Sequence, residues 1–150
     1  VIDLLDEGHV LLDTSGYGSE HDFRLLVKRC DLVYFDLKLI DSQLHKHYTG
    51  CDNAPILRNL AVLIEMGKPF VVRVPMVPDV TDTDQNLADI AQTIRGAPGL
   101  LQVDLLPYNK VAGSKYEYAG MNFKPDYDES RDLNYNTTIF KHAGIKVTIE

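Results

Sequence analysis

The chain has 150 residues, 45% of them hydrophobic and 25% charged, which is enough to bury one core but too little for two ordinary domains. Its formal net charge of -7 is spread along the sequence and disfavours a nucleic-acid partner, because phosphate binding requires a basic surface. No apolar run approaches the roughly 20 residues that cross a bilayer, so we expect no membrane partner and a cytoplasmic protein.

Strand and helix patterns alternate along the chain. Short apolar runs predict β-strands at residues 10–12, 32–38, 70–74, 100–106 and 145–149. Apolar residues at helical spacing predict helices at residues 23–30, 56–64, 87–94 and, with a weaker stripe, 130–142. Asp52 or Asn53 can cap the second helix, and Gly67 suits its end. Strands joined through helices run parallel, so we predict an α/β fold, either an open doubly wound sheet or a barrel.

The beginning of the chain resembles half of a strand–helix unit. Residues 1–7 have the pattern of a helix tail that Gly8 ends, and no strand precedes them. We therefore expect the N-terminal units to be absent and residues 1–150 to be the C-terminal portion of a single domain. The two cysteines, Cys30 and Cys51, have no paired spacing, which predicts reduced thiols and excludes an all-cysteine metal or cluster site.

Polar residues end four of the predicted strands. They are Asp13 and Thr14, Asp36 and Lys38, Arg73, and Tyr108 and Asn109. In both architectures the carboxyl ends of parallel strands meet at one edge, so we expect these residues to line one pocket. Tyr34, Asp36 and Lys38 share one strand face. A lining of mixed charge suits a zwitterionic ligand with a carboxylate and a cationic centre.

The same residues also have purely structural interpretations. Asp36 and Lys38 can form a local ion pair, and Arg73 can neutralise Asp13 or Asp36. Asp13 with Thr14 can instead form a turn in which the aspartate caps the following loop. The sequence by itself leaves these alternatives open.

Two histidines, His45 and His47, lie two residues apart and therefore do not share a helix face. A metal site formed by them would lack a third ligand nearby. We interpret both as solvated or loop-packing side chains.

Several short blocks, in this order, resemble those of the glycyl-radical enzyme activating family. They are residues 12–17 (LDTSGY), 35–38 (FDLK), 47–50 (HYTG) followed by Asn53 and 56–60 (ILRNL), 72–75 (VRVP) and 105–108 (LLPY). Lys115 with Tyr116, and residues 144–147, fit the C-terminal blocks of that family. A single block would carry little weight, but this series covers most of the chain.

The resemblance implies a partial β/α barrel of the radical S-adenosylmethionine type, similar to a TIM barrel, with parallel strands and outer helices. It also implies a 4Fe-4S cluster that binds S-adenosylmethionine and cleaves it reductively. The resulting radical takes a hydrogen atom from a glycine of a partner glycyl-radical enzyme such as pyruvate formate-lyase. A donor such as flavodoxin or ferredoxin supplies the electron.

Residue roles follow from the same resemblance. Lys38 and Arg73 match positions that contact the methionyl part of S-adenosylmethionine, and Asn109 stands where relatives often have a ligand-contacting histidine. A monovalent-cation site beside the ligand is matched by Asp13, Thr14 and Asp36, with the main-chain oxygen of Tyr34.

The sequence departs from the family in two further ways. Relatives hold the cluster with an N-terminal CxxxCxxC motif, which Cys30 and Cys51 do not match, so we expect no iron–sulfur ligand in this chain and no activity from it alone. Asp79 replaces a glycine. Two alternatives remain: a non-catalytic binding module for a large partner enzyme, and a Schiff-base barrel lyase that uses Lys38. The lyase needs a neutral Lys38 amine, which the nearby Asp36 opposes.

Overall fold

The computed structural model describes residues 8–108 and 125–150. One parallel sheet contains β1 (Leu11–Thr14), β2 (Leu32–Asp36), β3 (Phe70–Pro75), β4 (Leu100–Leu106) and β5 (Val147–Ile149). The helices are α1 (Glu20–Lys28), α2 (Ser42–Thr49), α3 (Ala54–Met66), α4 (Asp84–Ile94) and α6 (Thr137–His142). The predicted helix tail at residues 1–7, Asn109, and the block of Lys115 and Tyr116 lie outside the described residues.

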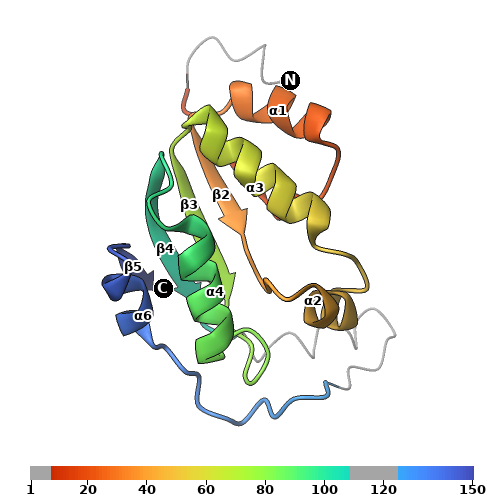
Figure 1. Cartoon of the computed structure of the whole chain (residues 1–150), viewed down its shortest axis with the longest axis vertical. Helices are drawn as coiled ribbons and strands as arrows, with labels where there is room; N and C mark the ends of the chain where they lie inside the picture. Colours follow the sequence, from red (N-terminus) through yellow and green to blue (C-terminus); the bar gives the residue numbers. More distant parts are fainter. Residues whose placement is uncertain (1–7, 109–124) are drawn as a thin grey trace.

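The strands follow one another across the sheet in chain order, β1-β2-β3-β4-β5, and every pair is parallel. Figure 1 shows α1, α3 and α4 lying on one face of this sheet. Sequential order with helices on one face matches a barrel wall more closely than a doubly wound sheet, which carries helices on both faces. The predicted α/β fold with parallel strands is confirmed, and closure of the sheet into a barrel stays a prediction.

The core lies between the sheet and these three helices. Val33 and Phe35 of β2 and Val72 and Val74 of β3 are fully buried on this face. They pack in one cluster with apolar helix residues, among them Val27, Leu60, Leu63, Leu87 and Ile90. Because side chains alternate along a strand, the intervening residues of β2 and β3 point to the opposite face. Asp36 and Arg73 belong to that opposite set.

The predicted helix borders are confirmed for α3, but one capping role is wrong. Gly67 ends α3 in the left-handed conformation, with φ 62°. Asn53 occupies the N-cap position, as predicted, but its side chain makes no capping hydrogen bond. The Asn53 amide instead donates to the main-chain carbonyl groups of Leu39 and Ile40.

A short helix that the sequence analysis did not predict follows β2. In α2, the Asp41 side chain accepts hydrogen bonds from the main-chain N–H groups of Gln43 and Leu44, both at 2.8 Å. Gly50 ends the helix with φ 77°. His45 lies within this helix, and its side chain packs against the following loop, where Nδ1 contacts Cys51 O at 2.8 Å.

Three other elements are shorter than predicted. β2 ends at Asp36 rather than at residue 38. The last main-chain hydrogen bond to β3 is the one that Leu37 N donates to Arg73 O, at 2.9 Å. The helix expected at residues 130–142 is only α6, and the strand expected at residues 145–149 is only β5. The chain before α6 is instead held by side chains of the α4 region; for example, Asn134 N donates to Asp82 Oδ2 at 3.0 Å.

Two of the loop residues with a left-handed backbone conformation follow strands of the sheet, Gly16 after β1 and Asp79 after β3. Gly16, after β1, has φ 71°, and a Cβ atom there would lie 2.4 Å from the ring of Phe35, so this turn requires glycine. Asp79, after β3, has φ 60° and is the one such non-glycine residue in the described part of the chain. Aspartate tolerates this conformation better than most residues. The conformation also accounts for glycine at this position in the resembling family.

Candidate functional site

Arg73 joins three strands on the face of the sheet opposite α1, α3 and α4. It pairs with Asp36 in the register of β2 and β3, and its Nε and Nη2 atoms donate to Asp36 Oδ1 at 3.0 and 2.8 Å. Nη2 also donates to Asp13 Oδ1 of β1 at 2.5 Å. The guanidinium carbon lies 5.2 Å from the centre of the Tyr34 ring. Arg73 therefore neutralises both carboxylates that the sequence analysis offered as its partners.

The environment of Arg73 favours its charged form. Its side chain is only 18% exposed, and burial by itself lowers the pKa of a guanidinium. The hydrogen bonds and negative charges of Asp36 and Asp13 outweigh this effect, so the pKa of Arg73 is raised. The guanidinium consequently acts as a fixed positive charge between two strands.

Lys38 follows β2 and lies between two cavities. Its Nζ atom is 3.7 Å from Asp36 Oδ2, which is the ion pair expected from the sequence, and its side chain is 37% exposed. Lys38 lines a cavity of about 290 Å³ with Tyr17 and His45, and a second cavity of about 260 Å³ with Tyr48 and several apolar side chains. The ammonium group can therefore meet an anionic group of a ligand in either cavity.

Asp13 and Thr14 separate to opposite faces of β1. Thr14 makes the turn after the strand, since its Oγ1 accepts a hydrogen bond from Gly16 N at 3.0 Å. The turn that the sequence allowed at Asp13 and Thr14 is thus made by Thr14, while Asp13 pairs with Arg73 through Oδ1. The structure thus brings Asp13, Asp36, Lys38 and Arg73 together, with the Tyr34 ring beside them.

A monovalent cation fits this site only in part. The Oδ1 atoms of Asp13 and Asp36 already accept hydrogen bonds from Arg73, so a cation would have to share them. Thr14 Oγ1 is engaged with Gly16. The cation site stays a prediction, and we derive no chemical step through it.

β4 adds a buried carboxylate that the sequence analysis missed. Asp104 is 1% exposed and lies beside Arg73 in the register of β3 and β4. Its Oδ1 atom accepts hydrogen bonds from Gln102 Nε2 at 2.7 Å and from the hydroxyl of Thr148. A polar row of Asp36, Arg73, Asp104 and Thr148 therefore crosses four strands. The available signal was a carboxylate inside a mostly apolar strand.

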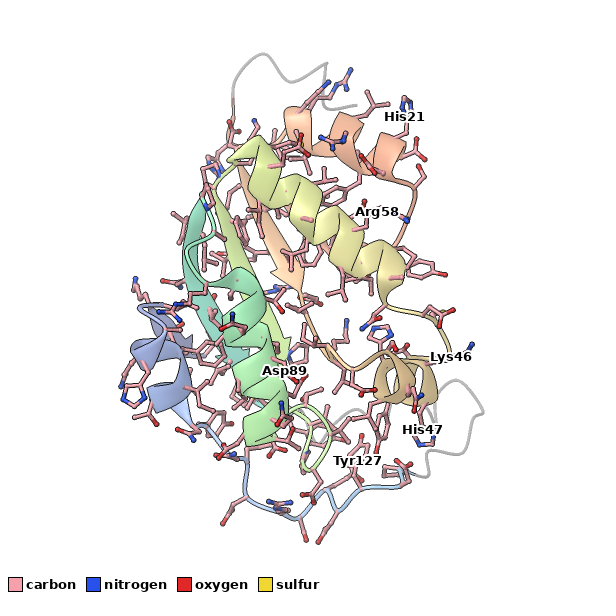
Figure 2. All side chains as sticks on the ribbon, viewed as in Figure 1. His21, Lys46, His47, Arg58, Asp89 and Tyr127 are labelled. Carbon is pink, nitrogen blue, oxygen red and sulfur yellow. The ribbon has the colours of Figure 1, made fainter. Side chains whose placement is uncertain are left out.

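An aromatic cluster connects the end of β4 with α2. The Tyr108 hydroxyl donates to Glu129 Oε1 at 2.5 Å and lies 3.2 Å from the hydroxyl of Tyr127. Burial, together with these hydrogen bonds, raises the pKa of Tyr108. His47 Nε2 lies 2.9 Å from Asp126 Oδ2. Figure 2 shows His47 and Tyr127 at the α2 end of the molecule.

The histidines and cysteines have separate roles. His45 is 4% exposed and donates from Nδ1 to the carbonyl of Cys51 at 2.8 Å, whereas His47 is solvated as expected. Cys30 is buried and donates to Leu26 O, while Cys51 is exposed. Within the described ranges, no group of three His, Cys, Asp or Glu side chains could hold a metal ion. The described residues therefore do not fit a 4Fe-4S cluster.

The parallel sheet with its covering helices is an α/β fold that matches a solved domain structure. The structure matches a domain of pyruvate-formate lyase-activating enzyme from Bacteroides vulgatus with a TM-score of 0.74 and 23% identity. The match covers 95% of this chain and 81% of that domain. At this identity, the likeness concerns the fold alone.

No helix of the described residues is long and apolar enough to span a membrane.

Curated proteins with similar sequences are activating enzymes. The chain is 35% identical over 111 residues to the trans-4-hydroxy-L-proline dehydratase activating enzyme of Clostridioides difficile, a match that covers 73% of the chain. It is 30% identical over 134 residues to the pyruvate formate-lyase-activating enzyme of Clostridium pasteurianum, which covers 89% of the chain. The homologues of this chain are therefore glycyl-radical enzyme activating enzymes, the family that the sequence blocks resemble.

The chain spans only part of these relatives. The matches cover 36% of the Clostridioides difficile protein and 56% of the Clostridium pasteurianum protein. A comparison with protein-family models finds no match.

Proposed function

We propose that this chain is part of an activating enzyme that uses S-adenosylmethionine and a 4Fe-4S cluster to generate a glycyl radical on a partner enzyme. The observation that carries the proposal is the strand-end site. Asp13, Asp36, Lys38 and Arg73 come from three neighbouring segments of the sheet and meet within hydrogen-bond or ion-pair distance. The family resemblance assigns these same residues to the ligand and its surroundings.

S-adenosylmethionine fits the described residues at its methionyl end. The Lys38 side chain is 37% exposed, its Nζ lies 3.7 Å from Asp36 Oδ2, and it borders two cavities, so it can bind the ligand carboxylate. Arg73 uses Nε and Nη2 for the aspartates, and its Nη1 has no hydrogen-bond partner in the described part of the chain. This nitrogen can donate to the same carboxylate. Asp13 and Asp36 hold the guanidinium in place for this contact.

The remaining parts of the reaction lie outside the described residues. A reduced cluster together with S-adenosylmethionine would supply the chemistry for hydrogen-atom abstraction from a glycine of the partner. We propose a glycyl-radical enzyme as that partner and a flavodoxin or ferredoxin as the electron donor, with the cluster ligands outside this chain. Asn109 is proposed as a further ligand contact and the pair of aspartates as a monovalent-cation site. We place the activity in the cytoplasm.

The two alternatives receive less support from the site. A Schiff-base lyase needs a neutral, desolvated lysine, whereas Lys38 is 37% exposed and paired with Asp36. A binding module for a large enzyme would not need a cluster of charges that matches a zwitterionic ligand. The activating enzyme is therefore the function that the geometry supports best.

The test is reconstitution of the protein together with the coding sequence upstream of Val1. The extended protein is loaded anaerobically with iron and sulfide, and its electron paramagnetic resonance spectrum is recorded with and without S-adenosylmethionine. We expect a 4Fe-4S signal that changes with the ligand, and release of 5'-deoxyadenosine. A Lys38→Met variant should keep the cluster signal but need a higher ligand concentration for the spectral change.

Two results would contradict the proposal. Absence of a cluster in the extended protein would exclude radical chemistry and favour the binding module. A cluster that is insensitive to S-adenosylmethionine in the wild type would exclude the activating function. Borohydride trapping of Lys38 with a carbonyl compound would instead support the lyase.

A further inference from the structure

The main chain after β2 is held by side chains rather than by the sheet. The last bond to β3 is from Leu37 N to Arg73 O. Beyond it, the carbonyl oxygens of three successive residues, 38–40, all accept hydrogen bonds from asparagine side chains. Buried main-chain polar groups require partners, and here two amides replace the missing strand.

Asn86 of α4 is the first of these two residues. It is buried, and its Nδ2 donates to Lys38 O at 2.8 Å and to Thr81 O at 2.9 Å. Its Oδ1 accepts from Ile40 N at 3.2 Å. The segment offers both a carbonyl and an N–H group at this point, and an amide side chain can satisfy both.

Asn53, just before α3, is the second. It is 3% exposed, and its Nδ2 donates to Leu39 O at 3.2 Å and to Ile40 O at 2.7 Å. This role explains why it makes no capping bond at the start of α3. The segment is therefore held from two different helices.

This arrangement fixes the direction of Lys38. Leu37 and Leu39 are 1% and 2% exposed, whereas the intervening Lys38 side chain is 37% exposed and reaches to 3.7 Å from Asp36 Oδ2. Asn86 also ties this segment to Thr81, in the loop after β3. Lys38, Leu39, Val77 and Thr81 line the cavity of about 260 Å³, so Asn86 sets the distance between two of its walls.

We propose that Asn86 and Asn53 are positioning residues for Lys38, and that they hold its ammonium group where it binds the carboxylate of a zwitterionic ligand. The inference rests on the proposed function for the identity of that ligand, S-adenosylmethionine. The asparagines do not contact the ligand themselves. They act through the main chain of residues 38–40.

The main test is a double-mutant cycle on ligand affinity. Asn86→Asp keeps the acceptor for Ile40 N but replaces the amide donor by an oxygen that faces Lys38 O and Thr81 O. The dissociation constant of S-adenosylmethionine is measured by calorimetry for the wild type, N86D, Lys38→Met and the double variant. We expect N86D to weaken binding about tenfold when Lys38 is present and less than about twofold when it is methionine.

A matched control is Asn59→Asp. Asn59 is also fully buried and donates to two carbonyl oxygens, those of Gly16 and Gly18, but it holds a different loop. Its effect on affinity should be the same with Lys38 and with Met at position 38. If N86D weakens S-adenosylmethionine binding equally with Lys38 and with Met at position 38, the proposal is overturned. Asn86 would then have a merely structural role. If N86D does not fold, Asn53→Asp takes its place in the cycle.

A ligand-independent measurement separates this proposal from the proposed function. If the wild type does not bind S-adenosylmethionine, the proposed function fails, and the side-chain ammonium signal of Lys38 is compared by nuclear magnetic resonance. We expect this signal to shift in N86D and in Asn53→Asp but not in Asn59→Asp. An unchanged Lys38 signal in both variants would overturn the positioning role.

Discussion

Removal of the Arg73 guanidinium should lower the free energy of unfolding. The size of the loss depends on how exposed its two carboxylate partners, Asp13 and Asp36, are to solvent. Arg73→Met removes three hydrogen bonds and leaves two carboxylates without their shared cation. Breaking a fully buried ion pair costs about 3–5 kcal/mol. Asp36 is 22% exposed, but Asp13 is 54% exposed and can be rehydrated, so its share is small. We therefore expect a loss of about 2 kcal/mol in the free energy of unfolding.

Urea unfolding followed by circular dichroism at pH 7 measures this loss. With a slope of about 2 kcal/mol/M, the midpoint should fall by about 1 M. Arg73→Lys keeps the positive charge but loses the planar guanidinium that donates from two nitrogens. Its urea midpoint should therefore lie between those of the wild type and R73M. Because the pKa of Arg73 is raised, its stabilisation is complete below the pKa of an arginine in the unfolded chain and is lost only as pH rises through the higher folded pKa. R73M should therefore show the same loss at pH 6 and pH 9.

The control is another arginine with two ion pairs. Arg24 contacts Glu20 and Glu65, each at 2.8 Å, but these carboxylates are 42% and 67% exposed. Arg24→Met should therefore change the urea midpoint much less than R73M. Equal changes for the two variants would refute the argument that the burial of the Arg73 site sets its contribution.

Other predictions concern the loops and the thiols. Cys51 should react with a thiol reagent in the native protein, whereas Cys30 should react only on unfolding, since burial raises the pKa of its thiol. The stability that Cys30 contributes is complete below the pKa of its thiol in the unfolded chain and is lost as pH rises through the higher folded pKa, so Cys30→Ala should flatten the fall in the urea midpoint at alkaline pH. Gly16→Ala should lower the free energy of unfolding by about 2–4 kcal/mol, because it adds both a strained φ and a contact with the buried ring of Phe35. Gly18→Ala is its control, because a Cβ atom there meets no neighbour within 4 Å.

Much of the fold was predictable because the apolar pattern is regular. The buried face of β2 alternates with Tyr34 and Asp36, and the period of two predicted that these residues share the opposite face. α2 was missed because its eight residues contain little apolar periodicity, and its stability depends on the Asp41 cap and the Gly50 end. A weak stripe before α6 predicted helix where side-chain contacts to α4 determine an irregular path.

The sequence predicted which residues form the site, but it did not predict most of the hydrogen bonds and ion pairs between them. Asp36 and Lys38 could be paired from their spacing in one strand. The sharing of Arg73 between two carboxylates depends on the register of three strands, which a sequence pattern does not specify. The roles of Asn53 and Asn86 depend on contacts 13 to 48 residues away along the chain, so nothing local to either residue could indicate them.

The charges at the strand ends balance one another, and this has a consequence for association kinetics. Two carboxylates, of Asp13 and Asp36, face one guanidinium and one ammonium, of Arg73 and Lys38. The site therefore presents little net potential to an approaching molecule, although it presents strong local fields at close range. A zwitterion would be selected by where its charges fit rather than by long-range attraction. Its association rate should accordingly change little with ionic strength, even though the chain as a whole carries a charge of -7.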